Sequence, residues 1–212
     1  MQYIFFCWKE GIMSRKYEKE AAWNQYMHMK SGIYQMLYPE LANDCMISEA
    51  NWKERNLLSS SSEFGIHARK GDICYMDFGQ AYLNEIGFQH FAIIMSIYNL
   101  KALCIPMTSN IKTLESAYDP KRNPYGKKHL MKIGKIEGMA KPSVLFLNDV
   151  KYVNTARIID VKAHLDPDSK LFHDIQQRML HLMVSDEEDN SGSTASNRNR
   201  NVVTYNWQKW IG

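Results

Sequence analysis

The fold is decided by residues 70–110, which read KGDICYMDFGQAYLNEIGFQHFAIIMSIYNLKALCIPMTSN. Residues 72–78 alternate in hydrophobicity, residues 91–98 form an apolar run, and residues 100–107 lead into a polar corner. These patterns predict three short β-strands. The loop between the first two strands, residues 79–90, is the expected place for a site, because a rigid sheet fixes its loops while their tips stay accessible.

The composition is that of an ordinary globular protein. The 212 residues are 45% hydrophobic and 23% charged, with a net charge of +3. This length allows one domain with its own core plus appendages. The longest apolar runs, 3–8 and 91–98, are far shorter than the roughly 20 residues needed to span a bilayer. We therefore expect no membrane span and no signal peptide.

The cysteines show no metal-binding pattern. Cys7, Cys45, Cys74 and Cys104 lack the close Cys and His spacing of a zinc site. Cys74 and Cys104 fall within strand patterns, where a small buried thiol is the simpler interpretation. We expect reduced thiols, a cytoplasmic location, and no metal or other cofactor.

The N-terminal part is predicted to be helical. Residues 14–37 place apolar side chains near one helical face, and Pro39 should end that helix. A second, weaker helix is expected over 48–58, and the serines at 59–62 resemble a linker. Residues 1–64 are therefore interpreted as a helical extension with a linker.

The rest of the chain predicts further strands and a closing helix. Residues 113–128 contain several Pro and Gly signals and read as a long excursion. Strands are expected at 129–133, 143–147, 149–153 and 156–159, and a helix at 167–183 with Asp166 as its N-cap. The polar residues 185–201 should be a disordered linker, followed by an apolar tail at 202–212.

Many short strands and a closing helix over residues 65–184 predict a mainly β fold with appended helices (α+β), a small and strongly bent antiparallel barrel. Residues 119–141 concentrate positive charge, with seven Lys or Arg against two acidic residues. A polyanion binder needs such a segment, although a solvated basic hairpin is the simpler explanation of this feature by itself.

Several motifs follow one another in the chain: KGDI at 70–73, Asp77, NEIGFQHFAII at 84–94 and PMTS at 106–109. Their order resembles that of the MazF/PemK-type toxin endoribonuclease family. The similarity covers about residues 68–183 and leaves both ends unexplained. It implies an SH3-like barrel that forms a homodimer, cleaves single-stranded RNA without a metal, and has an antitoxin protein as partner.

The resemblance also implies which residues serve the chemistry. In the family, an arginine at the end of the loop and a threonine at the end of the third strand act on the RNA. Thr108 matches the threonine, but His90 stands where the family has arginine. Asn84 and Glu85 match the small polar residue and the glutamate that precede it.

The histidine can be judged from chemistry. Metal-free RNA cleavage needs a base for the ribose 2′-OH, donors to the phosphorane oxygens, and an acid for the leaving oxygen. Because imidazole titrates near neutrality, His90 could act as base or acid, but it gives up the permanent charge of arginine. Lys70, His129, Lys141 or Arg157 could restore that charge.

We predict two groups of site residues. The catalytic candidates are His90, Thr108, Glu85, Lys70 and His129. The RNA-binding candidates are Asn84, Gln89, Ser109, Arg122, Lys127, Lys128 and Lys141.

Plainer alternatives stay open for these residues. His90 could be a satisfied core histidine, Thr108 could only cap a turn, and Glu85 could pair with a basic neighbour. Arg157 is more simply a structural residue. The leading hypothesis is a toxin-like endoribonuclease, its rival is a non-catalytic SH3-like module that binds nucleic acid or protein, and a third possibility is a structural or regulatory partner protein.

Overall fold

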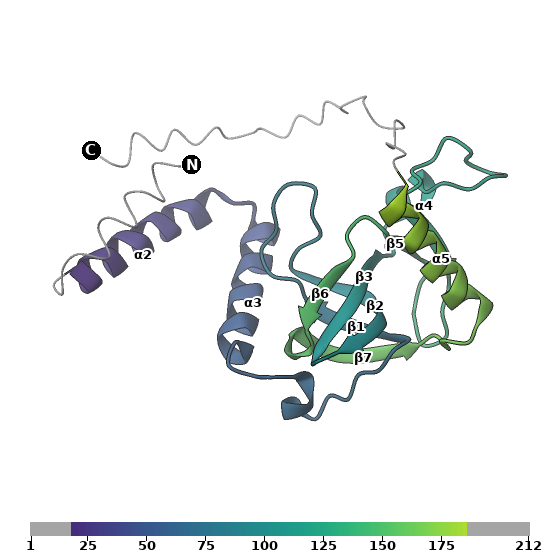
Figure 1. Ribbon diagram of the computed structural model, residues 1–212. Helices are drawn as coiled ribbons and strands as arrows, with labels where there is room; N and C mark the ends of the chain where they lie inside the picture. The colour runs from purple at the N-terminus through teal and green to yellow at the C-terminus, as the bar shows by residue number, and fades with distance from the viewer. Residues whose placement is uncertain (1–17, 186–212) are drawn as a thin grey trace. The chain divides into compact units, whose positions relative to one another are not determined.

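The computed structural model describes residues 18–185. The chain divides into two compact units, Met1–Glu54 and Arg55–Gly212, and each is described by itself (Figure 1). Apart from Ser185, the predicted linker at 185–201 and the apolar tail at 202–212 lie outside the described residues. Within the described part, no helix has both the length and the apolar character needed to cross a membrane.

The first unit contains two helices joined by a polar contact. Helix α2 spans Glu18–Met36 and helix α3 spans Pro39–Arg55. Glu49 of α3 forms an ion pair with Lys30 of α2 and accepts a hydrogen bond of 2.8 Å from Tyr34 Oη. Burial and the neighbouring carboxylate of Glu49 raise the pKa of Tyr34, so its hydroxyl stays protonated and donates.

Helix α3 begins earlier than the sequence pattern predicts. The structure places its first residue at Pro39, whereas the expected helix starts at Ser48. Proline is well suited to the first helical position, because its missing N–H would have no intrahelical partner there and its φ is already helical. Pro39 therefore separates the two helices by starting the second one.

The second unit is built on seven strands. Residues 70–110 supply β1 (Asp72–Asp77), β2 (Gln89–Tyr98) and β3 (Lys101–Thr108), so the three expected strands are confirmed. The other strands are β4 (Leu130–Gly134), β5 (Ser143–Phe146), β6 (Lys151–Asn154) and β7 (Ile158–His164). Short helices η1 (Ser61–Phe64), α4 (Ile111–Ser116) and η2 (Thr155–Arg157) and the longer α5 (Lys170–Val184) complete the unit.

The strands form one antiparallel sheet in the order β4-β5-β3-β2-β1-β7, and β6 pairs with the hairpin end of β3. The mainly β class with appended helices is thus confirmed. Strand β3 carries two partners along one edge, β5 at its carboxyl end and β6 at its amino end, which fits a bent sheet. Among the described strands no ladder joins β4 to β7, so the sheet is not closed.

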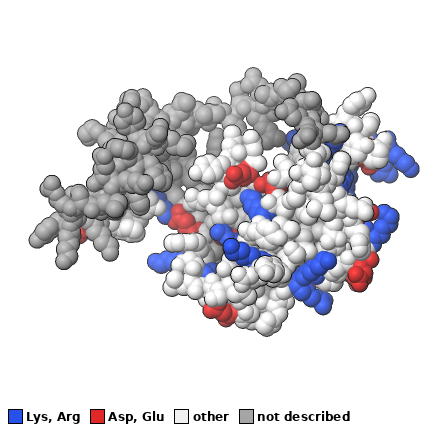
Figure 2. Space-filling view, in the orientation of Figure 1, with Lys and Arg blue, Asp and Glu red and all other residues white. Residues whose placement is uncertain are grey.

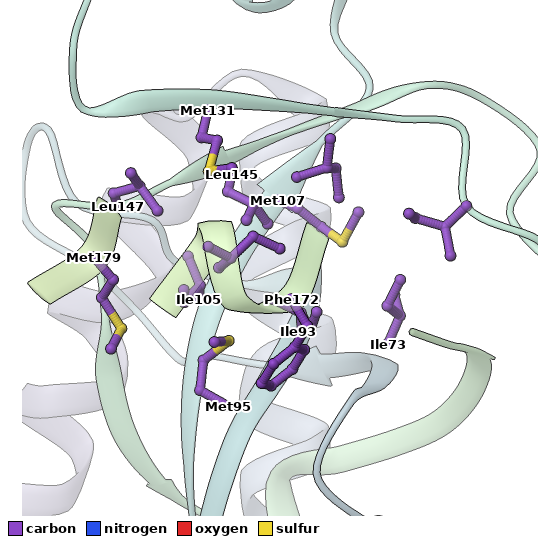
Figure 3. Packing of buried hydrophobic residues seen from close by; sticks show 13 residues of the cluster. Ile73, Ile93, Met95, Ile105, Met107, Met131, Leu145, Leu147, Phe172 and Met179 are labelled. Carbon is purple, nitrogen blue, oxygen red and sulfur yellow. The ribbon is translucent and has the colours of Figure 1, made fainter. Parts of the chain in front are cut away.

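Helix α5 covers one face of the sheet and completes the main core. Phe172 and Ile175 are fully buried and Met179 is 6% exposed. They pack against residues from β1 to β5, including Ile73, Ile93, Ile105, Met107 and Leu145 (Figure 3). The opposite face holds a second cluster around Met76, Ala92, Ile94, Cys104 and Ile158.

Helix α5 starts later than predicted. Its N-cap is Ser169, whose Oγ accepts a hydrogen bond of 3.2 Å from the amide of Phe172. Asp166 instead caps the preceding turn, since its carboxylate accepts from the amide of Asp168 at 2.9 Å. Because Ser169 is the N-cap in place of Asp166, the first helical residue is Lys170 and not Pro167.

The serines at 59–62 are held by the second unit. Ser60 and Ser61 are 8% and 4% exposed, and Ser61 Oγ donates to the carbonyl of Ile66 at 2.8 Å. Ser61 also begins η1. A run of serines indicates a linker only where the hydroxyl groups have no hydrogen-bond partner in the domain. Here the hydroxyl of Ser61 has such a partner, the carbonyl of Ile66.

We predict that Phe172→Ala lowers the free energy of unfolding of the full chain by about 3–5 kcal/mol, because it leaves a cavity under α5. Leu180→Ala on the same helix removes a side chain that is 55% exposed. This control should change stability by less than about 0.5 kcal/mol. Urea unfolding followed by circular dichroism measures both, and equal losses would contradict the packing of α5 on the sheet.

Candidate active site

Strands β2 and β3 bring His90 and Thr108 side by side. The β2–β3 ladder ends with the pair Phe91–Met107. One further step of this register sets His90 opposite Thr108, and both residues belong to their strands. Directly opposed residues point to the same face and have Cβ atoms about 4.5–5.5 Å apart.

A β-bulge sets this pairing. The register of the ladder shifts between Ile94 and Ser96, because Met95 is an extra residue on β2. Bulges bend a strand and re-aim its side chains. Without the extra residue, the ladder would be displaced by one position and Thr108 would no longer lie opposite His90.

The pair lies on the sheet face that α5 leaves uncovered. Phe91 and Met107, the adjacent residues, pack into the core beneath α5. Strand alternation therefore turns His90 and Thr108 to the opposite face. Both residues are partly exposed, so the pair is not sealed in an apolar interior.

The hydroxyl of Thr108 caps the turn that follows β3. Its Oγ1 accepts a hydrogen bond of 3.2 Å from the backbone amide of Asn110. This contact is the turn cap that the plainer interpretation of Thr108 expected. Because the oxygen accepts this bond, the hydroxyl proton can still be donated to a ligand.

The same row of the sheet continues on both sides of the pair. On one side it holds Met76 of β1 and Ile158 of β7, which are both buried. On the other side Thr108 pairs with Val144 of β5, and Val144 pairs with Lys132 of β4. Neighbouring strands lie about 4.8 Å apart, so the Cα atoms of Lys132 and Thr108 are about 10 Å apart.

Lys132 is a site residue that the sequence prediction missed. It is partly exposed and shares the face and the row of Thr108. A single cation inside the apolar strand LMKIG was the available signal. That signal could not be used, because the sequence does not show which row of which neighbouring strand Lys132 joins.

Arg157 and Gln89 lie beside the pair, at the loop end of β1 and β2. Arg157 Nη1 donates to the carbonyl of Asp77 at 3.1 Å, and Asp77 pairs with Gln89, the residue before His90. The side-chain amide nitrogen of Gln89 is buried and has no hydrogen-bond partner among residues 18–185. A bound ligand can satisfy a buried donor of this kind.

The loop between β1 and β2 is anchored at both ends. The amide of Phe88 donates to the carbonyl of Gly79 at 2.6 Å, which closes the neck of the loop. Two residues before Phe88, the carbonyl of Ile86 accepts a hydrogen bond from Lys151 Nζ at 2.7 Å, and the amide of Ile86 donates one to the carboxylate of Asp149 at 3.4 Å. The loop is therefore fastened to the segment that leads into β6.

Two residues of the candidate site take part in the loop itself. The carboxylate of Glu85 accepts a hydrogen bond of 3.2 Å from the amide of Tyr82, and both residues are exposed. Asn84 is exposed and has a φ of 71°, a left-handed conformation that asparagine tolerates better than most residues. Both residues therefore shape the turn at the tip of the loop.

Two catalytic candidates lie away from the pair. Lys70 precedes β1 and its Nζ lies 5.1 Å from the centre of the Phe172 ring, on the α5 side of the sheet. It is six residues from Met76, the partner of His90, which corresponds to about 20 Å of extended chain. His129 lies three residues before Lys132, at the far end of β4.

The remaining RNA-binding candidates are exposed residues of the connecting segments. Ser109 follows β3, and Lys141 lies two residues before β5. Arg122, Lys127 and Lys128 lie between α4 and β4. The structure therefore brings His90 and Thr108 together, while Gln89, the residue before His90, points to the opposite face of β2 and the other candidates lie outside the pair.

The described cysteines do not offer an activated nucleophile. Burial raises the pKa of Cys74 to about 12 and raises the pKa of Cys104 as well. Both thiols are buried and free, as the strand patterns predicted. Within residues 18–185, no three His, Cys, Asp or Glu side chains form a group that could hold a metal ion.

Comparison with known proteins gives matches among solved structures. No protein-family model matches the chain, and no curated protein matches its sequence. MazF (Form-I) from Deinococcus radiodurans is similar with a TM-score of 0.41 and 15% identity, over 56% of this chain and 97% of that chain. An endoribonuclease in complex with its cognate antitoxin from Mycobacterial species gives 0.38 and 9%, over 56% and 98%. MazE-MazF (Form-II) from Deinococcus radiodurans gives 0.36 and 14%, over 55% and 95%. Two of the three structures are of MazF proteins.

Proposed function

We propose that this chain is a toxin-like endoribonuclease that cleaves single-stranded RNA without a metal ion. The observation that carries the proposal is the β2–β3 register, which, extended by one pair, sets the partly exposed His90 opposite the partly exposed Thr108. An imidazole and a hydroxyl in this arrangement provide a proton acceptor and a hydrogen-bond donor on the same side of a bound phosphate. Lys132, in the same row, adds a positive charge.

The proposed reaction is an internal displacement at phosphorus. His90 takes the proton from the ribose 2′-OH, and the 2′-oxygen forms a bond to phosphorus as the bond to the 5′-oxygen breaks. The leaving 5′-oxygen takes a proton from water, and His90 returns its proton to the solvent, so the products are a 2′,3′-cyclic phosphate and a 5′-hydroxyl. Thr108 and Lys132 stabilise the negative charge that develops on the phosphorane oxygens.

Lys132 supplies the positive charge that the family arginine would otherwise provide. A neutral histidine leaves the phosphate without the permanent charge that arginine provides in the family. Lys132 lies on the far side of Thr108 from His90, so proton transfer and charge stabilisation are divided between two side chains. Arg157, whose Nη1 is bonded to a backbone carbonyl, adds charge near Gln89.

The partners follow from the same resemblance. We propose that the chain acts as a homodimer and that an antitoxin protein inhibits it. Its substrate class is single-stranded RNA, because an unpaired strand exposes both its phosphates and its base faces.

One observation supports a second candidate function. The histidine at position 90 departs from the family arginine, and a chain without catalytic activity could use the same surface as a binding module. Such a protein would bind single-stranded RNA but leave it intact. Measuring cleavage and binding side by side separates the two functions.

We predict that the purified chain cleaves single-stranded RNA in the presence of EDTA. His90→Ala should lower the cleavage rate by about 10²–10⁴-fold, because it removes the proton acceptor. Thr108→Val should lower it by about 10²–10³-fold, whereas Thr108→Ser, which keeps the hydroxyl, should retain most activity. Gel analysis of an end-labelled RNA measures each rate.

His67→Ala is the matched control, because His67 is exposed and precedes β1. It should cleave at the wild-type rate, and circular dichroism should show that all variants fold. Full activity in folded His90→Ala protein would contradict the proposed role of His90. Binding without cleavage by the wild-type chain would favour the second function.

A separate prediction concerns Lys132. Lys132→Gln should lower the cleavage rate by at least about tenfold, because it removes positive charge from the developing phosphorane. Lys135 lies just beyond the same strand and is exposed, so Lys135→Gln is the charge-matched control. Equal effects of the two substitutions would show that only the general positive charge matters, and would remove Lys132 from the site.

A further inference from the structure

The segment between α4 and β4 projects from the second unit (Figure 1). We call residues 117–128 the cationic arm. Figure 2 shows Lys and Arg side chains at the upper right, where the arm projects in Figure 1, as well as elsewhere on this face. Four exposed cations lie on the arm. They are Lys121, Arg122, Lys127 and Lys128. Among them Tyr125 is 90% exposed.

The cationic arm is folded onto itself. At its root, the amide of Tyr118 donates to the carbonyl of Lys127 at 3.1 Å. Nearer the tip, Asp119 and Asn123 exchange two backbone hydrogen bonds of 3.0 and 2.9 Å. The side-chain amide of Asn123 also donates to the carbonyls of Glu115 and Ala117 at 3.0 and 3.3 Å.

The single carboxylate of the arm serves its internal structure. Asp119 Oδ1 accepts from the amides of Lys121 and Arg122 at 2.9 and 3.0 Å. These backbone hydrogen bonds lower the pKa of Asp119, and the nearby charge of Lys132 contributes to the same shift. Ala117, the first residue of the arm, belongs to one buried cluster with Leu130 and Val144. Because Val144 pairs with Lys132, the root of the arm lies beside the Lys132 end of the candidate site.

Helix α5 fastens the arm to the domain. Arg178 Nη2 donates to the carbonyl of Lys128 at 2.9 Å and to that of Leu130 at 3.3 Å. Its guanidinium also lies 5.7 Å from the centre of the Tyr118 ring. Desolvation lowers the pKa of Arg178. A half-buried guanidinium with these partners fixes the base of the arm, so the arm presents Tyr125 on a prepared scaffold.

A rigid loop that exposes an aromatic ring among cations has the features of a site for single-stranded nucleic acid. A base can stack on the ring whatever its identity, while the cations bind the flanking phosphates. Protein–protein interfaces are depleted in lysine, whereas the arm carries three lysines around its one exposed ring. The position of the arm next to Lys132 makes it the natural continuation of a path that starts at His90 and Thr108.

We propose that the cationic arm is a second contact site for single-stranded RNA, in which one base stacks on Tyr125 and the flanking phosphates pair with the four cations. The identity of the ligand rests on the proposed function. The site itself is separate from cleavage, since Tyr125 takes no part in the His90–Thr108 chemistry. It would hold the substrate beyond the scissile position and raise its affinity.

The test measures binding of the full chain to a fluorescein-labelled, mixed-sequence 2′-O-methyl RNA of 20 nucleotides by fluorescence anisotropy. This probe lacks the 2′-hydroxyl, so it cannot be cleaved by internal attack. Tyr125→Ala should weaken binding about 5- to 150-fold, the effect expected for loss of one base stack. Tyr125→Phe, which keeps the stacking surface, should bind within about twofold of the wild type.

Tyr152→Ala is the matched control, because Tyr152 is 62% exposed on β6. It should bind like the wild type. The double variant K121Q/R122Q should reduce the slope of log affinity against log salt by about 0.7 for each phosphate that the variant no longer neutralises. Wild-type affinity in Tyr125→Ala, or an equal loss in Tyr152→Ala, would overturn the arm as a binding site.

The outcomes separate this proposal from the proposed function. If the wild type cleaves RNA and Tyr125→Ala binds RNA normally, the proposed endoribonuclease function stands and the arm is not a binding site. If Tyr125→Ala loses RNA binding and the wild type does not cleave RNA, the arm is a binding site and the proposed endoribonuclease function is wrong. If Tyr125→Ala leaves RNA binding intact but abolishes binding of a co-expressed acidic protein, the arm is a protein contact and the RNA proposal is wrong.

Discussion

The register of β2 against β3 is the constraint on which the candidate site depends. The hairpin that joins these strands has two central residues, Asn99 and Leu100, with φ values of 48° and 63°. A two-residue turn with both φ values positive matches the strand twist and fixes the first pairs. The bulge at Met95 then shifts the ladder by one residue. Turn and bulge together decide that His90 meets Thr108, and a slip of one position would turn either side chain to the other face.

The two faces of the sheet have different tasks because of this register. One face is closed by α5, whose Phe172 and Ile175 complete the core. The other carries a row of His90, Thr108, Val144 and Lys132, in which Val144 is fully buried and the other three side chains are partly exposed. Rigid strands hold these side chains, and pre-organisation of this kind favours catalysis because little ordering remains to be done when substrate binds. The cationic arm, whose base is bonded to Arg178, leads through His129 into β4, the strand that carries Lys132.

Much of the fold could be predicted from the sequence, because strand alternation and turn residues are local signals. The three strands of residues 70–110 and the buried thiols of Cys74 and Cys104 are examples. The start of α3 at Pro39 could not, because proline signals both the end of one helix and the beginning of another. The distance of Lys70 from the site could be predicted from the sequence. Lys70 precedes the predicted strand, and six extended residues separate it from the loop end of β1, where the site lies. Lys132 could not be placed, because its row depends on pairings with β5 and on the bulge in β2 that no local pattern reveals.

The pairing of His90 with Thr108 is tested most directly by a nuclear Overhauser effect between the ring protons of His90 and the methyl group of Thr108 in the isotope-labelled chain. Opposed residues on one sheet face lie close enough for a strong cross-peak. We expect this cross-peak together with one between Ala92 and Pro106, the next pair on the same face. A cross-peak from Thr108 to Phe91, with none to His90, would show a ladder displaced by one residue and would contradict the proposed site.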